Sequence, residues 1–305
     1  MMIDPALREA LAGISGILVT PFDADDRIAP ARLQPIVDRA VAAGVHMLVA
    51  NGNTGEFYGL TVPEAERMVH AAAEIVAGRV PLIGGVGKSI GDACAIARAS
   101  RAAGARVLMV HQPPDPFVAP RGVVEYVKRV ADAGDGLPIM LYLRNDAIGL
   151  DAIQALTEVP GVAGVKWACP TPMRLAEAIR RCSPDIVWVD GLAEPWAPPF
   201  YAVGARGFTS GLINVWPAQS VAIHRALAAG DYVEASRLIA VMAPFEEIRA
   251  EEMSGANVSG VKAALQFIGE DCGPTRPPSA WPLTEAQSRK MRESLKAWGI
   301  PAGPR

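Results

Sequence analysis

Short apolar runs alternate along the chain with longer stretches in which apolar residues recur every three or four positions. The short runs are typical of buried β-strands, and the longer stretches have the periodicity of amphipathic helices. Eight strands are predicted, at residues 17–20, 45–50, 80–85, 106–110, 138–142, 162–166, 186–190 and 207–210. Helices are predicted between them, for example at residues 31–43, 63–77, 91–103, 123–133 and 217–229.

This strict alternation of strands and helices indicates an α/β protein with a parallel sheet. Eight units of this size fit a closed (β/α)₈ barrel, the TIM barrel, better than an open doubly wound sheet. Glycines at Gly44, Gly104 and Gly230 follow predicted helices, where a helix commonly ends on a left-handed residue.

The strand signals stop after residue 231, while helical patterns continue at residues 232–252, 258–268 and 285–298. Segment 273–278 contains three prolines, which cannot continue a helix, and is predicted to be a rigid connector. We therefore expect a barrel at residues 1–230 and, packed on it, a C-terminal helical extension at residues 231–305.

Composition narrows the ligand class. Half of the 305 residues are apolar, and 29 basic side chains nearly balance 32 acidic ones, which gives a net charge of −3. The chain has no basic stripe, which argues against a nucleic-acid partner because counterion release requires clustered Lys and Arg. No apolar segment is long enough to span a bilayer, and the N-terminus lacks the layout of a signal peptide. We expect a cytoplasmic protein with a small-molecule ligand and no membrane association.

The cysteines and histidines predict no metal site. No C-x-x-C pair occurs, and the histidines show no ligand spacing. The residues concerned are Cys94, Cys169, Cys182, Cys272, His46, His70, His111 and His224.

A lysine lies at the end of the sixth predicted strand, which otherwise consists of small and apolar residues. Burial disfavours the charged ammonium, so Lys166 is a candidate nucleophile that forms a Schiff base with a carbonyl group. The alternative is a lysine whose alkyl stem follows the strand while its ammonium reaches water or a carboxylate.

The second predicted strand is followed by a glycine-flanked polar loop at residues 51–57. Gly52 and Gly55 allow a sharp turn in which successive N–H groups form an anion nest. Together with Asn53 and the hydroxyl of Thr54, they are predicted to bind a carboxylate. A plain polar turn is the alternative.

Three further candidates follow the fourth and fifth predicted strands. Tyr142 lies next to the lysine strand in a barrel, where its phenol can relay protons, and Arg144 can pair with a second substrate carboxylate. His111 opens a proline-rich loop and is a candidate proton shuttle that titrates near neutrality. Each has an alternative interpretation. Tyr142 could be an ordinary aromatic residue at a strand end, Arg144 a surface cation, and His111 a structural histidine.

Taken together, residues 19–22, the loop at 52–56, Tyr142 and the Gly164-Val-Lys166 motif resemble the dihydrodipicolinate synthase / N-acetylneuraminate lyase family of class I Schiff-base enzymes. The resemblance covers nearly the whole chain. It implies that Lys166 forms the imine, that Tyr142 relays protons and that residues 52–55 bind the carboxylate of a 2-oxo acid such as pyruvate. It also implies homotetramers and no cofactor beyond the covalent imine.

Some motifs depart from those of dihydrodipicolinate synthases proper. Asn53 stands where those enzymes have threonine, and loop 111–122 lacks their relay tyrosine. Segments 53–61, 142–146 and 273–278 are more similar to 5-dehydro-4-deoxyglucarate dehydratases, although that branch tends to have glycine at position 53 and asparagine at position 143. This branch removes water and carbon dioxide from a six-carbon 2-oxo diacid.

The sequence therefore predicts a Schiff-base lyase and leaves open which reaction follows imine formation. Dehydration with decarboxylation is favoured over aldol cleavage to pyruvate or a synthase-like condensation, and a catalytically silent metabolite-binding barrel is the alternative from another class. Additional candidate substrate-binding side chains on or after the eighth predicted strand are Thr209, Ser210 and Asn214.

Overall fold

Eight parallel strands close into a barrel in chain order, with β1 paired to both β2 and β8. The computed structural model describes residues 3–278 and 280–303. The strands are β1 Ile14–Ile17, β2 Met47–Ala50, β3 Leu82–Val86, β4 Val107–His111, β5 Ile139–Leu143, β6 Val162–Trp167, β7 Val187–Asp190 and β8 Gly207–Ser210. The predicted (β/α)₈ barrel is confirmed.

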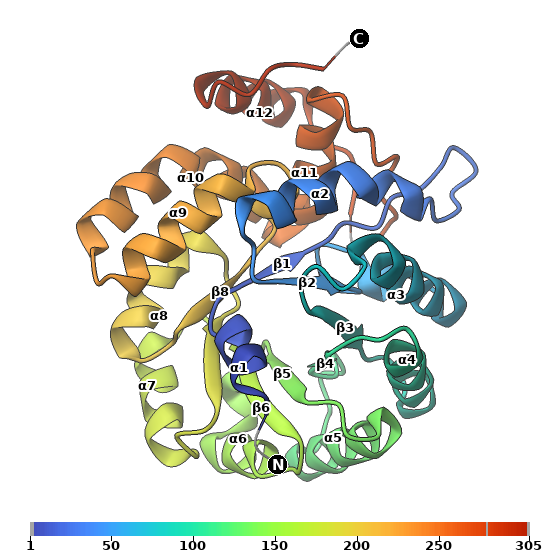
Figure 1. The fold of residues 1–305 in the computed structure, drawn as a ribbon, viewed down its shortest axis with the longest axis vertical. Coiled ribbons are helices and arrows are strands. Elements are labelled where there is room, and N and C mark those ends of the chain that lie inside the picture. The colour runs from blue at the N-terminus through green and yellow to red at the C-terminus, as the bar shows by residue number, and fades with distance from the viewer. Residues whose placement is uncertain (1–2, 279, 304–305) are drawn as a thin grey trace.

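A ring of helices surrounds the strands (Figure 1). Its members are α2 Gln34–Ala43, α3 Val62–Val76, α4 Ile90–Ala102, α5 Pro120–Gly134, α6 Leu150–Thr157, α7 Pro172–Arg181, α8 Ala197–Val203 and α9 Pro217–Ala228. Local sequence sets several of their ends. Thr61 and Glu64 form a capping box at the start of α3, and Gly44 ends α2 with a positive φ of 90°.

Alternate strand residues belong to two apolar clusters. Met47 and Val49 pack in one cluster, whereas Leu48 and Ala50 pack in the other, which includes the surrounding helices. The first cluster also contains Leu7 and Leu11 of α1 Pro5–Leu11, and Figure 1 shows α1 over the middle of the barrel. The barrel is therefore a packed core, and α1 covers one of its ends.

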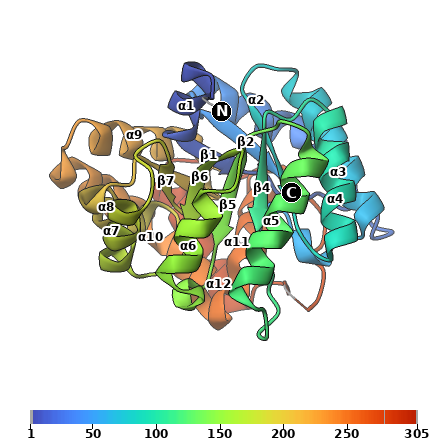
Figure 2. The same cartoon turned by 90° about the horizontal axis from the view of Figure 1, so that it is seen from below.

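Within the described residues, three helices follow the barrel, as expected: α10 Tyr232–Ser254, α11 Ala256–Phe267 and α12 Glu285–Ala297. Figure 2 shows α11 and α12 on the side of the barrel opposite α1. The backbone of α10 leaves the helical region at Glu251, and Glu252 and Met253 have left-handed dihedrals. Near its C-terminal end the helix therefore bends sharply, beside the mouth of the barrel.

The position of the first strand is corrected. The prediction at residues 17–20 overlaps β1 only at Ile17, because β1 pairs through Ser15–Ile17 with β2 and through Ile14–Gly16 with β8. Residues 14–20 are all buried, so apolar periodicity does not mark where pairing stops. The helices α1, α6, α7 and α8 were not delimited by the sequence pattern.

Candidate active site

A cavity of about 330 Å³ lies at the C-terminal ends of the strands. Catalytic groups of TIM barrels gather at this end. The structure brings six of the predicted site residues together in its lining, namely Asn53, Thr54, Tyr142, Arg144, Lys166 and Thr209. Five others, Gly52, Gly55, His111, Ser210 and Asn214, lie outside the lining.

Lys166 is buried at the end of β6, with 3% of its surface exposed. Burial lowers the pKa of its ammonium from 10.5 to about 7; the Asp190 carboxylate opposes this shift, and Arg144 and Arg249 add to it. A substantial fraction of the amine is therefore neutral at physiological pH, as a carbonyl nucleophile requires.

Tyr142 lies directly beside the lysine, because β5 and β6 pair with Tyr142 opposite Lys166. The Lys166 Nζ is 3.9 Å from the centroid of the Tyr142 ring. Burial raises the pKa of the Tyr142 phenol to about 12, so this group keeps its proton at neutral pH. A neutral amine and a protonated phenol thus lie next to each other in the cavity.

The glycines of loop 51–57 act differently from the prediction. Gly52 and Gly55 do not have positive φ; the left-handed residues are Asn51 and Glu56. A Cβ on Gly52 would overlap the Ile17 side chain, and one on Gly55 would lie 3.0 Å from the Leu18 carbonyl oxygen. The two glycines therefore permit close packing against the end of β1 and the residue that follows it, and the neighbouring Asn53 and Thr54 line the cavity.

His111 ends β4 but is buried and does not line the cavity. Its Nε2 is 3.1 Å from the Asn51 carbonyl oxygen, which can only accept, so Nε2 carries the proton and Nδ1 accepts from the Tyr58 hydroxyl at 3.3 Å. Burial, with the Lys166 charge, lowers its pKa to about 3. His111 is therefore not expected to titrate near neutrality, contrary to what the prediction of a proton shuttle assumed. The His111 ring lies 5.1 Å from that of Tyr142.

The side chains of Ser210 and Asn214 form hydrogen bonds within the barrel and its loops. The Ser210 hydroxyl donates to Glu194 at 2.6 Å and contacts the Ser220 hydroxyl at 3.1 Å. The Asn214 side chain accepts from Val19 N–H and donates to the Ile17 and Gly211 carbonyl oxygens. Both side chains are buried outside the cavity, and this placement does not favour substrate binding.

Two buried carboxyl groups lie behind the site, and no sequence pattern indicated them. Asp190 ends β7, and Glu194 begins the short helix η4 Glu194–Trp196; neither is exposed to solvent. Burial raises the pKa of Asp190 well above its usual range. Burial, and then the charge of Glu246, raise the pKa of Glu194 to about 7. These carboxyl groups are therefore readily protonated.

Several cavity residues come from places that sequence patterns did not indicate. The loop after β7 contributes Leu192, Ala193 and Trp196, and the C-terminal extension contributes Glu246, Arg249, Ser254 and Asn257. Charged residues on α10 are indistinguishable in sequence from an ordinary solvated helix face.

Ala193 has φ 67° and ψ −176°, a region that is essentially restricted to glycine. Such a conformation costs about 1–3 kcal/mol, and glycine in its place costs about 0.5–1 kcal/mol in chain entropy. We therefore expect Ala193→Gly to raise the free energy of unfolding by about 1 kcal/mol in urea titrations.

Ala197→Gly is the matched control for this substitution. Ala197 is also buried but has φ −59°, so the same change should lower the free energy of unfolding. An equal loss of stability in both variants would show that Ala193 is not strained.

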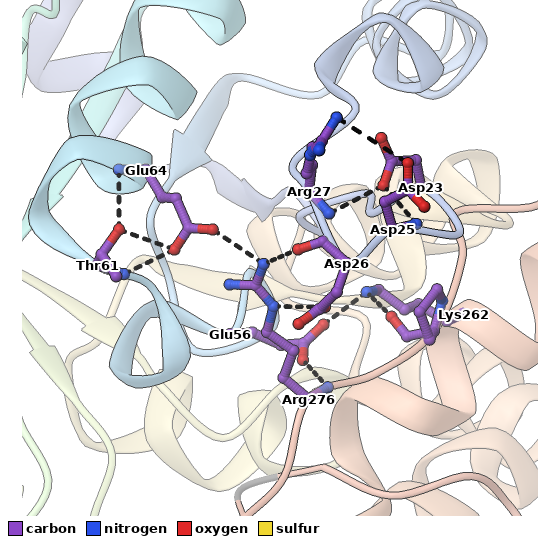
Figure 3. A network of polar contacts seen from close by, with 10 residues as sticks. Asp23, Asp25, Asp26, Arg27, Glu56, Thr61, Glu64, Lys262 and Arg276 are labelled. Carbon is purple, nitrogen blue, oxygen red and sulfur yellow. Dashed lines mark hydrogen bonds and ion pairs between the residues drawn. The ribbon is translucent and has the colours of Figure 1, made fainter.

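Loop 51–57 is tied to the C-terminal extension by a buried ion pair (Figure 3). Glu56, which has no exposed surface in its side chain, pairs with Lys262 of α11 at 2.6 Å. The second carboxylate oxygen accepts the backbone N–H of Arg276 at 2.8 Å. The Arg276 side chain in turn contacts Asp26 and Glu64. The predicted connector at 273–278 is therefore anchored to the loop that carries Asn53 and Thr54.

Among the described residues, no group of three or more His, Cys, Asp or Glu side chains is arranged to hold a metal ion. Over the same residues, no helix combines the length and apolar character needed to cross a membrane.

The chain is similar to known proteins over most of its length. The dihydrodipicolinate synthetase family matches residues 10–298. A probable 5-dehydro-4-deoxyglucarate dehydratase of Rhizobium rhizogenes is 31% identical over 278 residues, which cover 89% of this chain and 91% of that protein. A 4-hydroxy-tetrahydrodipicolinate synthase of Exiguobacterium sibiricum is 32% identical over 292 residues, which cover 94% and 97%. Dihydrodipicolinate synthase from Bacillus clausii superposes with a TM-score of 0.92 at 34% identity, over 96% of this chain and 100% of that structure.

Proposed function

Because the chain belongs to the dihydrodipicolinate synthetase family, whose members are class I lyases, we propose that Lys166 forms a Schiff base with a 2-oxo acid. The observation that supports this most directly is the buried lysine itself. Its pKa of about 7 and its position against the Tyr142 ring give a neutral amine beside a proton donor.

In the proposed reaction, the Lys166 amine attacks the 2-oxo carbon, and the carbonyl oxygen leaves as water when the protonated imine forms. Tyr142 donates and recovers the protons that these steps require. Asn53 and Thr54 bind the adjacent carboxylate. The imine then withdraws electrons from the neighbouring carbon, so a C–H proton can leave and an enamine forms. The imine supplies the electron sink, and no other cofactor is proposed.

The favoured outcome is dehydration with decarboxylation of a 5-dehydro-4-deoxyglucarate-type diacid. The motifs at 53–61 and 142–146 support it, and relatives with this name and with the synthase name are equally similar. Aldol cleavage to pyruvate is the second candidate, because it uses the same imine. Release of carbon dioxide favours the dehydratase, and release of pyruvate favours the aldolase.

Borohydride trapping tests the imine and its pH dependence together. Reduction in the presence of pyruvate should leave a stable adduct that peptide mapping locates on Lys166. Since only the neutral amine attacks, the rate of adduct formation should rise with pH through about 7 and level off near about pH 8.

An adduct on another lysine, or none, would contradict the mechanism. Tight binding of the 2-oxo acid without trapping would instead support a silent metabolite-binding barrel. A midpoint near the ordinary lysine pKa of 10.5 would show that Lys166 is solvated.

We also propose a homotetramer, as the family resemblance implies, and a location in the cytoplasm. Light scattering of the purified protein measures the number of subunits.

A further inference from the structure

The order of strands around the barrel restricts how a substrate can lie. Asn53 and Thr54 follow β2, and Lys166 is on β6, on the opposite side of the eight-stranded ring. A 2-oxo acid held at both points has its carboxylate toward β2 and its 2-oxo carbon at β6. The rest of its carbon chain then extends either toward β5 or toward β7 and β8.

Most of the residues that line the cavity lie toward β7 and β8. Among the described residues, the β5 side contributes Tyr142 and Arg144 alone to the lining. The other side contributes the loop after β7, Thr209 and Gly211 of the β8 end, and five residues of the C-terminal extension. A chain longer than pyruvate therefore has room on the side that the extension covers.

On this side the cavity has a buried arginine. Arg249 of α10 has 6% of its surface exposed. Its guanidinium pairs with Glu246, and its Nε and Nη2 both donate to the Asn257 side-chain oxygen, at 3.2 Å and 2.5 Å. A Cβ on Gly211 would lie 2.8 Å from the Arg249 Cζ, so only glycine lets the guanidinium lie against the end of β8.

The guanidinium keeps donors for a ligand. These contacts use the Nε–H and one N–H on each terminal nitrogen, and a guanidinium has five N–H groups. Within the described part of the chain, one N–H on Nη1 and one on Nη2 are left. Arg144 also lines the cavity but is exposed. An exposed charge is screened by water, so the buried, fixed arginine discriminates between ligands more strongly.

We propose that Arg249 is a specificity-determining residue, which binds the distal carboxylate of a 2-oxo diacid. The inference rests on the proposed function, since it presumes an imine at Lys166. It assigns a role to the C-terminal extension, which would select diacids over 2-oxo acids with an apolar end. Arg144 is then left to attract anions at the exposed side of the cavity.

The test compares 2-oxoadipate with 2-oxohexanoate, which have the same chain length and differ in the distal carboxylate. Half-saturating concentrations for borohydride trapping are measured for both ligands and for pyruvate. The wild type should prefer the diacid by about 10- to 100-fold, the range expected for a charged hydrogen-bonded pair. Arg249→Gln should bring the ratio of the 2-oxohexanoate value to the 2-oxoadipate value down to about 1. Because the Arg249 charge also lowers the pKa of Lys166, its removal shifts the values for all three ligands together, and this shift cancels in the ratio. A merely structural role would leave the ratio unchanged.

Two further variants control the experiment. Arg39→Gln alters another partly buried arginine that pairs with a carboxylate, that of Glu270, but does not line the cavity, and it should keep the preference. Arg249→Gln combined with Glu246→Gln avoids an unpaired carboxylate if the single variant folds poorly.

A preference that persists in Arg249→Gln, or that is absent from the wild type, would overturn the inference. If no ligand is trapped on wild-type Lys166, the proposed function fails. Calorimetric affinities for 2-oxoadipate and 2-oxohexanoate then still decide the role of Arg249.

Discussion

Replacing Lys166 with methionine should lower kcat by at least about 10⁴-fold, because the reaction loses the nucleophile on which every later step depends. Methionine has a similar length and no charge, so it removes the cost of burying an ammonium. We therefore expect the urea unfolding midpoint of Lys166→Met to equal or exceed that of the wild type. Turnover of the identified substrate and urea titration measure the two effects.

Lys88→Met is the control. Lys88 is also partly buried, and burial also lowers its pKa, but it lies outside the cavity, with its ammonium 5.0 Å from the centroid of the Phe57 ring. This variant should turn over substrate nearly as fast as the wild type. Retention of more than about 1% of kcat in Lys166→Met would exclude covalent catalysis by this lysine.

The positions of Lys166 and Tyr142 in the cavity were accessible from sequence because each ends a predicted strand. In a parallel barrel, strand ends converge at one mouth, and chain order gives strand adjacency. Register then places Tyr142 opposite Lys166. The barrel fold and the pairing of Lys166 with Tyr142 can thus be predicted from hydrophobic patterns that each extend over only a few residues.

The surroundings of this pair could not be predicted in the same way. Burial and the charge of Lys166 lower the pKa of His111, and its hydrogen bonds reach Asn51 and Tyr58, which lie more than fifty positions away in the chain. Arg249 reaches the cavity only because the extension folds over the strand ends. Such environments depend on tertiary packing, which local periodicity does not encode.

Glu56 also has an environment that depends on tertiary packing. The sequence places it in a loop, whereas in the structure its side chain is fully buried against Lys262 (Figure 3). Lys262→Met would leave the Glu56 carboxylate without a counter-ion in a site that excludes water. Breaking a buried pair in this way costs about 3–5 kcal/mol. We therefore expect that loss in the free energy of unfolding, measured by urea titration, with weaker binding of the 2-oxo acid because loop 51–57 loses its anchor.

Adding Glu56→Gln to Lys262→Met should restore most of the lost stability, since a neutral amide can still accept the Arg276 backbone N–H and carries no unpaired charge. Arg27→Met changes an ion pair of the same network that is mostly exposed and should leave the unfolding midpoint unchanged. The double variant could instead be as unstable as Lys262→Met alone. The lysine would then stabilise the fold through its ammonium over the Phe22 ring, whose centroid is 4.3 Å from Nζ, and the ion pair itself would contribute little.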